Sequence, residues 1–134
     1  REIETWSFDG ELKLIKRVVN RFNDELNELR IMNCDEDGKF LPNKFGVIVE
    51  YRKFDSIDQN QVLEKLYFDS SMHLVDANHE HIGNNYSLLE YSQIKYEMDK
   101  DGFLNATYLN SHGEVVCKGN VYTGEFEIIE IISH

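Results

Sequence analysis

The stretch that decides the fold is DKDGFLNATYLNSHGEVVCKGNVYTGEFEI, residues 99–128. Turn-forming residues interrupt it at Asp99–Gly102, at Asn110–Gly113 and at Thr123–Gly124. Glycine after a polar residue suits a tight hairpin, because glycine adopts positive φ without a steric penalty. The runs between these turns are short, which is typical of strands. The stretch therefore predicts an antiparallel meander.

The same pattern of short runs and turns continues toward the N-terminus. We expect strands at 45–54, 62–69, 72–75, 88–98, 103–109, 114–118 and 125–132. Residues 55–61 are polar and form a loop or one helical turn, and a short helix over 59–66 capped by Asp58 is the alternative to the favoured strand at 62–69. Residues 68–82 and 99–116 look alike, since each segment begins near an aspartate and soon reaches a second turn. We interpret this likeness as a shared hairpin pattern rather than a repeat. No helix-patterned segment separates the later strands, so a parallel βαβ sheet is not expected.

The first part of the chain has a different periodicity. Apolar residues recur at spacings of three and four, which is typical of one face of an α-helix. They are Leu12, Ile15, Val18, Val19, Phe22, Leu26 and Leu29. Asp9 precedes them and is a suitable N-cap, because its carboxylate can accept the free N–H groups of the first turn. The pattern predicts an amphipathic helix over about 10–31.

These elements predict a single α+β domain over residues 1–134. The helix must bury its apolar stripe, and one face of the sheet is the only large surface available for it. We therefore expect the N-terminal helix to pack across a curved antiparallel sheet of five to seven strands. Cystatin-like and NTF2-like folds share this outline.

Charge restricts the classes of partner. Lys and Arg number 14 and Asp and Glu number 25, giving a net charge of −11. Such a chain repels nucleic acid and anionic lipid, so we expect neither a nucleic-acid nor a membrane partner. A basic protein partner is favoured instead. Cys34 and Cys117 lie far apart in the sequence and form no metal-binding motif. We expect reduced thiols and a cytoplasmic location.

Residue patterns for metal binding or catalysis are weak. His73, His79 and His81 are near one another, and two imidazoles in an H-x-H pattern on a strand could bind a metal. An exposed turn is the preferred interpretation of these histidines. The turns Asp35–Gly38 and Asp99–Gly102 resemble part of a calcium loop but lack an acid at its twelfth position. No nucleophile motif is present, so we expect no cofactor and no enzymatic activity.

Acidic groups and tyrosines are the predicted partner-binding residues. Acids could replace the phosphates of a nucleic acid in a basic groove, and tyrosines are frequent interface anchors. The predicted set is Asp24, Glu28, Asp35, Glu36, Asp37, Tyr67, Tyr91, Glu97, Asp99 and Asp101.

Two functions remain open. The favoured hypothesis is a small acidic protein that neutralises a basic protein partner, as an immunity protein or antitoxin blocks a bacterial nuclease-type toxin. The alternative is a small-molecule-binding protein or enzyme with a pocket between helix and sheet, using His73, Tyr96 or Tyr108. Residues 125–132 form a core strand or, at a sheet edge, pair with a second copy of the chain to form a homodimer.

Overall fold

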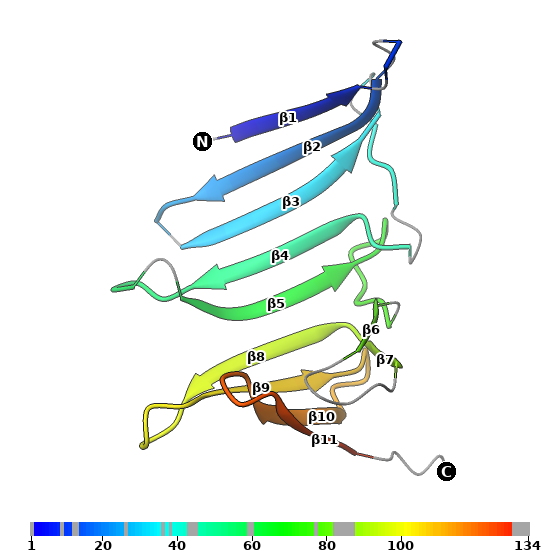
Figure 1. Cartoon of the computed structure of the whole chain (residues 1–134). Coiled ribbons are helices and arrows are strands. Elements are labelled where there is room, and N and C mark those ends of the chain that lie inside the picture. Colours follow the sequence, from blue (N-terminus) through cyan, green and yellow to red (C-terminus); the bar gives the residue numbers. More distant parts are fainter. Residues whose placement is uncertain are drawn as a thin grey trace.

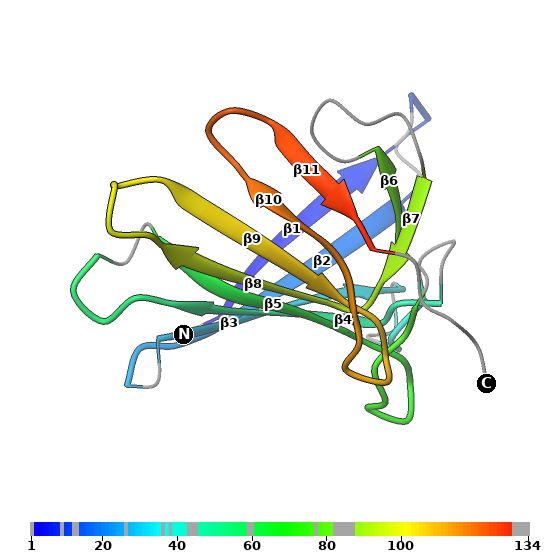
Figure 2. The same ribbon diagram turned by 90° about the horizontal axis from the view of Figure 1, so that it is seen from below.

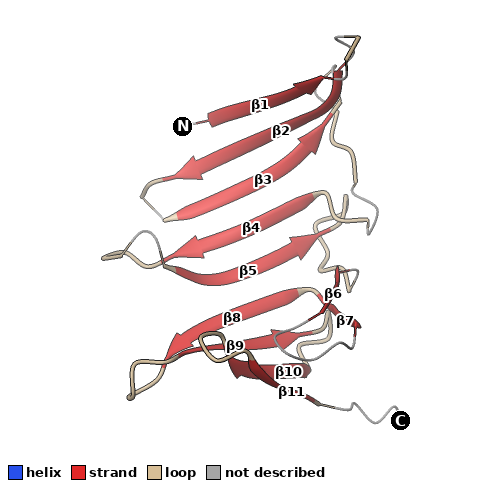
Figure 3. Ribbon diagram, in the orientation of Figure 1, coloured by secondary structure: helices blue, strands red, loops and turns tan. Residues whose placement is uncertain are grey.

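The computed structural model is built from β-strands (Figures 1 and 3), and it contains no helix among the residues that it describes. Those residues are 2–8, 10–11, 14–25, 27–35, 37, 39–42, 46–58, 61–76, 78–81 and 88–129. The first five strands are β1 (Glu2–Phe8), β2 (Leu14–Asn23), β3 (Glu28–Cys34), β4 (Val49–Phe54) and β5 (Val62–Phe68). The others are β6 (Asn78–His81), β7 (Leu88–Tyr91), β8 (Gln93–Met98), β9 (Leu104–Leu109), β10 (Val115–Asn120) and β11 (Glu125–Ile128).

Nine strands form one antiparallel sheet in the order β1-β2-β3-β4-β5-β8-β9-β10-β11. The remaining two, β6 and β7, form a separate hairpin that the chain inserts between β5 and β8. Seen from below in Figure 2, the β8–β11 region curls up from the plane of β3–β5, and the β6–β7 hairpin lies on the same side. We call this side of the sheet the inner face and the opposite side the outer face.

Four hairpin turns of the described chain share one hydrogen-bond pattern. Oδ1 of the first residue accepts the backbone N–H of the residues two and four positions later, at 2.8 to 3.0 Å. Its own N–H donates to the carbonyl four positions later, at 2.9 Å. The turns begin at Asp35, Asp69, Asp99 and Asn110. This geometry is the physical basis of the likeness between residues 68–82 and 99–116.

The fourth position of this turn needs a left-handed backbone. Gly102 and Gly113 occupy it with φ of 83° and 79°. Met72 occupies the same position in the Asp69 turn with φ of 59°. Glycine has no Cβ to clash in this region, whereas methionine is strained there.

The two faces of the sheet carry separate cores. On the inner face, Ile94, Ala106, Tyr108 and Cys117 pack with Tyr91, and Ala106, Tyr91 and Cys117 are completely buried. On the outer face, a smaller cluster joins the N-terminal strands through Val19, Met32, Cys34 and Val49. The sheet therefore changes the face that it buries along its width.

Aromatic edge-to-face contacts extend through the inner core. The Tyr91 ring centroid lies 4.9 Å from that of Tyr108 and 6.0 Å from that of Tyr67. Tyr108 in turn contacts Phe126 of β11, with the ring centroids 6.0 Å apart. These T-shaped pairs add to the free energy of apolar burial and link β5, β7, β9 and β11.

The predicted helix over 10–31 is wrong, and with it the α+β fold class. The described part of this region forms β2 and β3, joined by a turn in which Asn27 has φ of 53°. Val18 and Val19 point to opposite faces, and β-branched side chains favour the pleated surface of a sheet. Both faces are partly covered here, so apolar residues follow no clean period of two.

The strand pattern after residue 45 agrees in part with the prediction. The meander is confirmed, but its sheet has nine strands rather than five to seven. The run 88–98 divides at Ser92, whose backbone bonds both β5 and β9. His79 and His81 lie on β6 rather than in an exposed turn. Within the described chain, no helix is long and apolar enough to cross a membrane.

Candidate protein-binding surface

Antiparallel topology gathers four connections at one end of the sheet. The turns β2–β3, β4–β5, β8–β9 and β10–β11 all lie there, on the left in Figure 1. We call this end of the sheet, formed by these four turns and the strand residues that flank them, the turn end. Neighbouring strands are about 4.8 Å apart, so segments distant in sequence lie close together along this end.

Seven acidic residues belong to the turn end. They are Asp24, Glu25, Asp55, Asp58, Glu97, Asp99 and Asp101. Lys53 and Lys100 are the cations in or beside the same turns. The turn end therefore has a clear excess of negative charge, which attracts basic groups over the Debye length of about 8–10 Å.

Two of these acids hold the turns in shape. Oδ1 of Asp99 accepts the N–H groups of Asp101 and Phe103, and Oδ2 accepts Nδ2–H of Asn105 at 3.0 Å. Oδ1 of Asp55 accepts the N–H groups of Ile57 and Asp58. These hydrogen bonds lower the pKa values of both carboxyls, that of Asp99 chiefly through Phe103 N–H. The other five acids are exposed.

Large apolar side chains are exposed among the acids. Five of the ten exposed large hydrophobic residues in the described chain belong to the turn end: Ile57 (95% exposed), Tyr122 (60%), Met98 (44%), Phe103 (41%) and Val121 (39%). The rings of Phe103 and Tyr122 are 6.5 Å apart and join two turns. Apolar anchors surrounded by polar groups are typical of protein interfaces.

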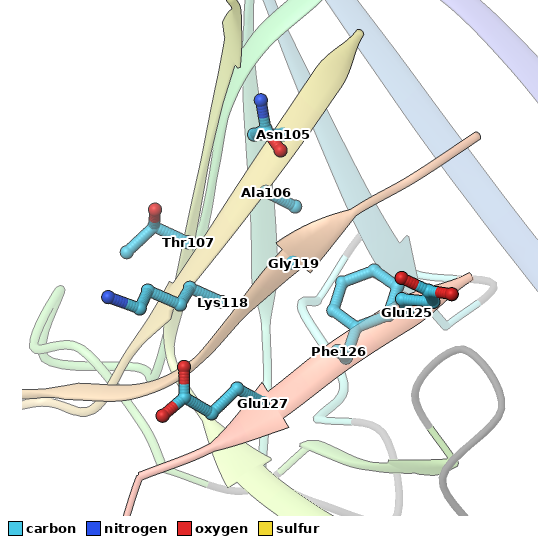
Figure 4. Close-up of a pocket in the computed structure, with 8 residues that line it drawn as sticks. All are labelled: Asn105, Ala106, Thr107, Lys118, Gly119, Glu125, Phe126 and Glu127. Atoms are coloured by element: carbon cyan, nitrogen blue, oxygen red, sulfur yellow. The ribbon is translucent and has the colours of Figure 1, made fainter. Parts of the chain in front are cut away.

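A cavity of about 500 Å³ adjoins the turn end across β9, β10 and β11 (Figure 4). Lys118 and Glu127 are register partners and extend to the same side, whereas Phe126 lies against Gly119. Asn105 lines the cavity and donates to Asp99, so the cavity is continuous with the acidic turns. Glu125 and Glu127 also line the cavity, so it has carboxylates of its own in addition to those of the acidic turns.

The predicted partner-binding residues divide into three groups. Asp24, Glu97, Asp99 and Asp101 lie at the turn end. Glu28 begins β3, is half-buried on the outer face and accepts a hydrogen bond from the Tyr51 hydroxyl.

The other members lie elsewhere. Asp35 and Asp37 are at the opposite end of the sheet, and Glu36 lies outside the described residues. Tyr67 and Tyr91 belong to the inner core, where they are 7% and 0% exposed. Neither tyrosine is on the surface as an anchor would be.

The sequence prediction missed Asp55, Ile57 and Asp58. The polar run 55–61 was interpreted as a loop or a helical turn, with no reason to group it with Asp24 or Asp99. Only the register of β3, β4, β5 and β8 brings the three turns together. An isoleucine within a polar loop was the available signal.

Other proposed sites are not assembled by the described residues. No group of three or more His, Cys, Asp or Glu side chains that could hold a metal occurs among them, although the side chains of His79 and His81 lie outside this set. Cys117 is fully buried, and burial raises the pKa of its thiol to about 11, which makes it a poor nucleophile. The alternative function needs a pocket between a helix and the sheet, and the described residues form no helix that could line one.

Comparison with known proteins adds no assignment. A scan of family models finds no match to this chain, and searches of curated proteins and of solved structures find none.

Proposed function

We propose that this chain is a small acidic protein that binds and neutralises a basic protein partner, in the manner of an immunity protein or antitoxin acting on a nuclease-type toxin. The observation that carries the proposal is the coincidence, at the turn end, of exposed acids with exposed apolar side chains. Acids alone would give attraction without affinity, and apolar groups alone would give no selectivity for a basic partner.

Charge supplies the attraction. Asp24, Glu25, Asp58, Glu97 and Asp101 project from three adjacent turns. Lys and Arg side chains that hold the phosphates of RNA or DNA would meet carboxylates here instead. Complementary charge raises the association rate and rejects acidic partners.

Apolar contacts supply the affinity. Ile57 is 95% exposed at the tip of the β4–β5 turn, between the acids of the β2–β3 and β8–β9 turns. Removing such a side chain from water on binding contributes about 1.5–3 kcal/mol. A ring of charged groups around a central anchor is the arrangement of many interface hot spots.

The adjoining cavity supplies a place for a long basic side chain. Glu125 and Glu127 offer carboxylates there, on the side of the strand to which Lys118 also extends. One Lys or Arg of the partner would then be held more specifically than the exposed acids alone could achieve.

Two variants with equal charge test the proposal. E25Q/E97Q/D101N removes three exposed acids of the turn end, and E11Q/D37N/E90Q removes three exposed acids elsewhere. Both change the net charge by +3, and neither touches an Asp that holds a turn. Affinity capture from the source organism at about 50 mM salt, repeated at about 500 mM, identifies the partner. We expect only the turn-end variant to lose it.

Inhibition completes the test. The purified partner should be basic, and its nuclease activity should fall when the chain is added and recover with the turn-end variant. Ile57→Ser should weaken binding by about 10-fold or more without changing the melting temperature. Equal loss with both charge variants would reduce the effect to net charge alone and contradict a specific surface.

A further inference from the structure

A separate cavity lies on the outer face of the sheet. It has a volume of about 290 Å³ and runs along β4 and β5. The strand residues that line it stand opposite one another in three register pairs: Val49 with Phe68, Tyr51 with Leu66, and Lys53 with Glu64. The cavity therefore extends over five residues of strand, which is roughly 13 Å.

The two ends of this cavity differ in chemistry. Lys53 and Glu64 lie at one end, and Arg30 reaches the same region from β3, opposite Tyr51. Val49 and Met72 lie at the other end, where Val49 is also part of the outer core. Such a gradient fits a ligand with a polar head and an apolar chain.

The acids around the polar end of the cavity accept hydrogen bonds from other side chains of the protein. Glu28 accepts a hydrogen bond from the Tyr51 hydroxyl, and Glu64 accepts one from Nε2–H of Gln93 at 3.0 Å. Burial and the bond to Glu28 raise the pKa of Tyr51 far above its ordinary value, so its hydroxyl remains a donor.

The two cations have no comparable partners. The side chains of Arg30 and Lys53 make no hydrogen bond or ion pair with any residue in the described part of the chain. Both side chains are exposed, so their donors face solvent and are available to an anionic acceptor.

Met72 gives independent support. It occupies the left-handed turn position that Gly102 and Gly113 fill in the sister turns. Its side chain lines the apolar end of the cavity and is 54% exposed. Backbone strain tends to persist where a side chain has a function, and the flexible thioether of methionine adapts to apolar ligands.

We propose that the outer-face cavity binds a small amphipathic monocarboxylate, with its carboxylate at Arg30 and Lys53 and its apolar chain directed toward Met72. The planar guanidinium matches a carboxylate in shape. A phosphate dianion is disfavoured, because Glu28 and Glu64 flank the same end. The inference is independent of the proposed protein-binding function, since no acid of the turn end takes part.

Three probes with the same alkyl chain test the charge requirement. Octanoate, octan-1-ol and octylammonium are titrated into the full chain, with amide chemical shifts as the readout. We expect saturable binding of octanoate, at least about 10-fold weaker binding of the alcohol and weaker binding still of the cation. Octylammonium binding as tightly as octanoate, or no saturable octanoate binding, would overturn the proposal.

A matched pair of variants locates the carboxylate. Arg30→Gln and Lys95→Gln each remove one positive charge from the outer face, and Lys95 lies outside the cavity. Octanoate should bind at least about 10-fold more weakly to the Arg30 variant and nearly unchanged to the Lys95 variant. Equal affinities for the two variants would contradict the assignment of the head group.

Met72→Gly separates strain from binding. Relief of the left-handed backbone should raise the melting temperature by roughly 1–3 °C. Loss of the side chain should nevertheless weaken octanoate binding several-fold. Unchanged octanoate affinity would overturn the placement of the apolar chain at Met72.

Discussion

The β1–β3 region and the β8–β11 region are both antiparallel meanders, yet they bury their side chains differently. In β8, Ile94 is buried and its neighbour Lys95 is exposed. In β3, Leu29 is buried on the inner face, whereas Met32 and Cys34 are buried on the outer face. β8 packs a single face, whereas β3 changes its buried face partway along the strand.

This difference explains why the sequence of the N-terminal region predicts a helix where the protein forms strands. A strand that buries one face shows apolar residues two apart. A strand that changes its buried face places one apolar residue three positions after another, as from Leu29 to Met32. A spacing of three is also the spacing of a helix face. The apolar spacing of the N-terminal region therefore matches that of a helix, because the strand changes the face that it buries.

The largest expected effect tests whether the inner core is the more stable of the two. Ile94→Ala removes a side chain that is 3% exposed within the inner cluster and should reduce the free energy of unfolding by about 3–4 kcal/mol. Val19→Ala, in the outer cluster at 4% exposed, should reduce it by about 2 kcal/mol. Urea denaturation measures both. A larger loss for Val19→Ala would reverse the comparison.

A smaller effect tests how tightly β11 closes the curled region. A Cβ on Gly119 would lie 2.3 Å from the carbonyl oxygen of Glu125 and 2.6 Å from Cα of Phe126, so the backbone of β11 must shift. Gly119→Ala should therefore destabilise the fold by about 2–3 kcal/mol. Gly10→Ala is the control, because a Cβ there meets nothing within 4 Å. The melting temperature should fall clearly for Gly119→Ala and hardly change for Gly10→Ala. Similar melting temperatures for the two variants would show that the backbone of β11 shifts at little energetic cost.

The sequence predicted the β8–β11 region well, because its turns carry their own signals. Asp99 and Asn110 accept backbone N–H groups within five residues, and Gly102 and Gly113 supply the left-handed position. Such interactions are local, so the sequence alone reveals them. The strand predicted over 62–69 is observed at Val62–Phe68, where aromatic residues suit a pleated surface.

The candidate surface was predicted only in part, because it depends on non-local register. Asp24 and Asp101 were chosen from charge alone, and they lie at the same end of the sheet. Ile57 belongs with them only because β4 pairs with both β3 and β5. Tyr67 was chosen as an anchor from its residue type, and nothing local showed that it faces the inner core. Topology, which arises from long-range pairing, decided these placements.

The smallest expected effect concerns the turns that hold the β8–β11 region. The pKa of Asp99 is lowered, chiefly because its carboxylate accepts the N–H of Phe103. A group with a lowered folded-state pKa stabilises the fold above its unfolded pKa of about 3.9 and loses this contribution as pH falls through the folded value. Asn110 makes the same two backbone bonds with a neutral amide. Its turn therefore has no such acid sensitivity.

Exchanging the two residue types should move the acid sensitivity between the sister turns. Asp99→Asn keeps an oxygen acceptor but cannot titrate, so its melting temperature should fall less than that of the wild type between about pH 5 and pH 2. Asn110→Asp adds a titrating carboxylate at the equivalent position and should fall more. The measurement is the melting temperature across this pH range. Parallel curves for all three proteins would mean that the carboxylate and the amide accept the turn N–H groups equally well. The charge of Asp99 would then contribute to the negative potential of the turn end and not to the stability of the hairpin.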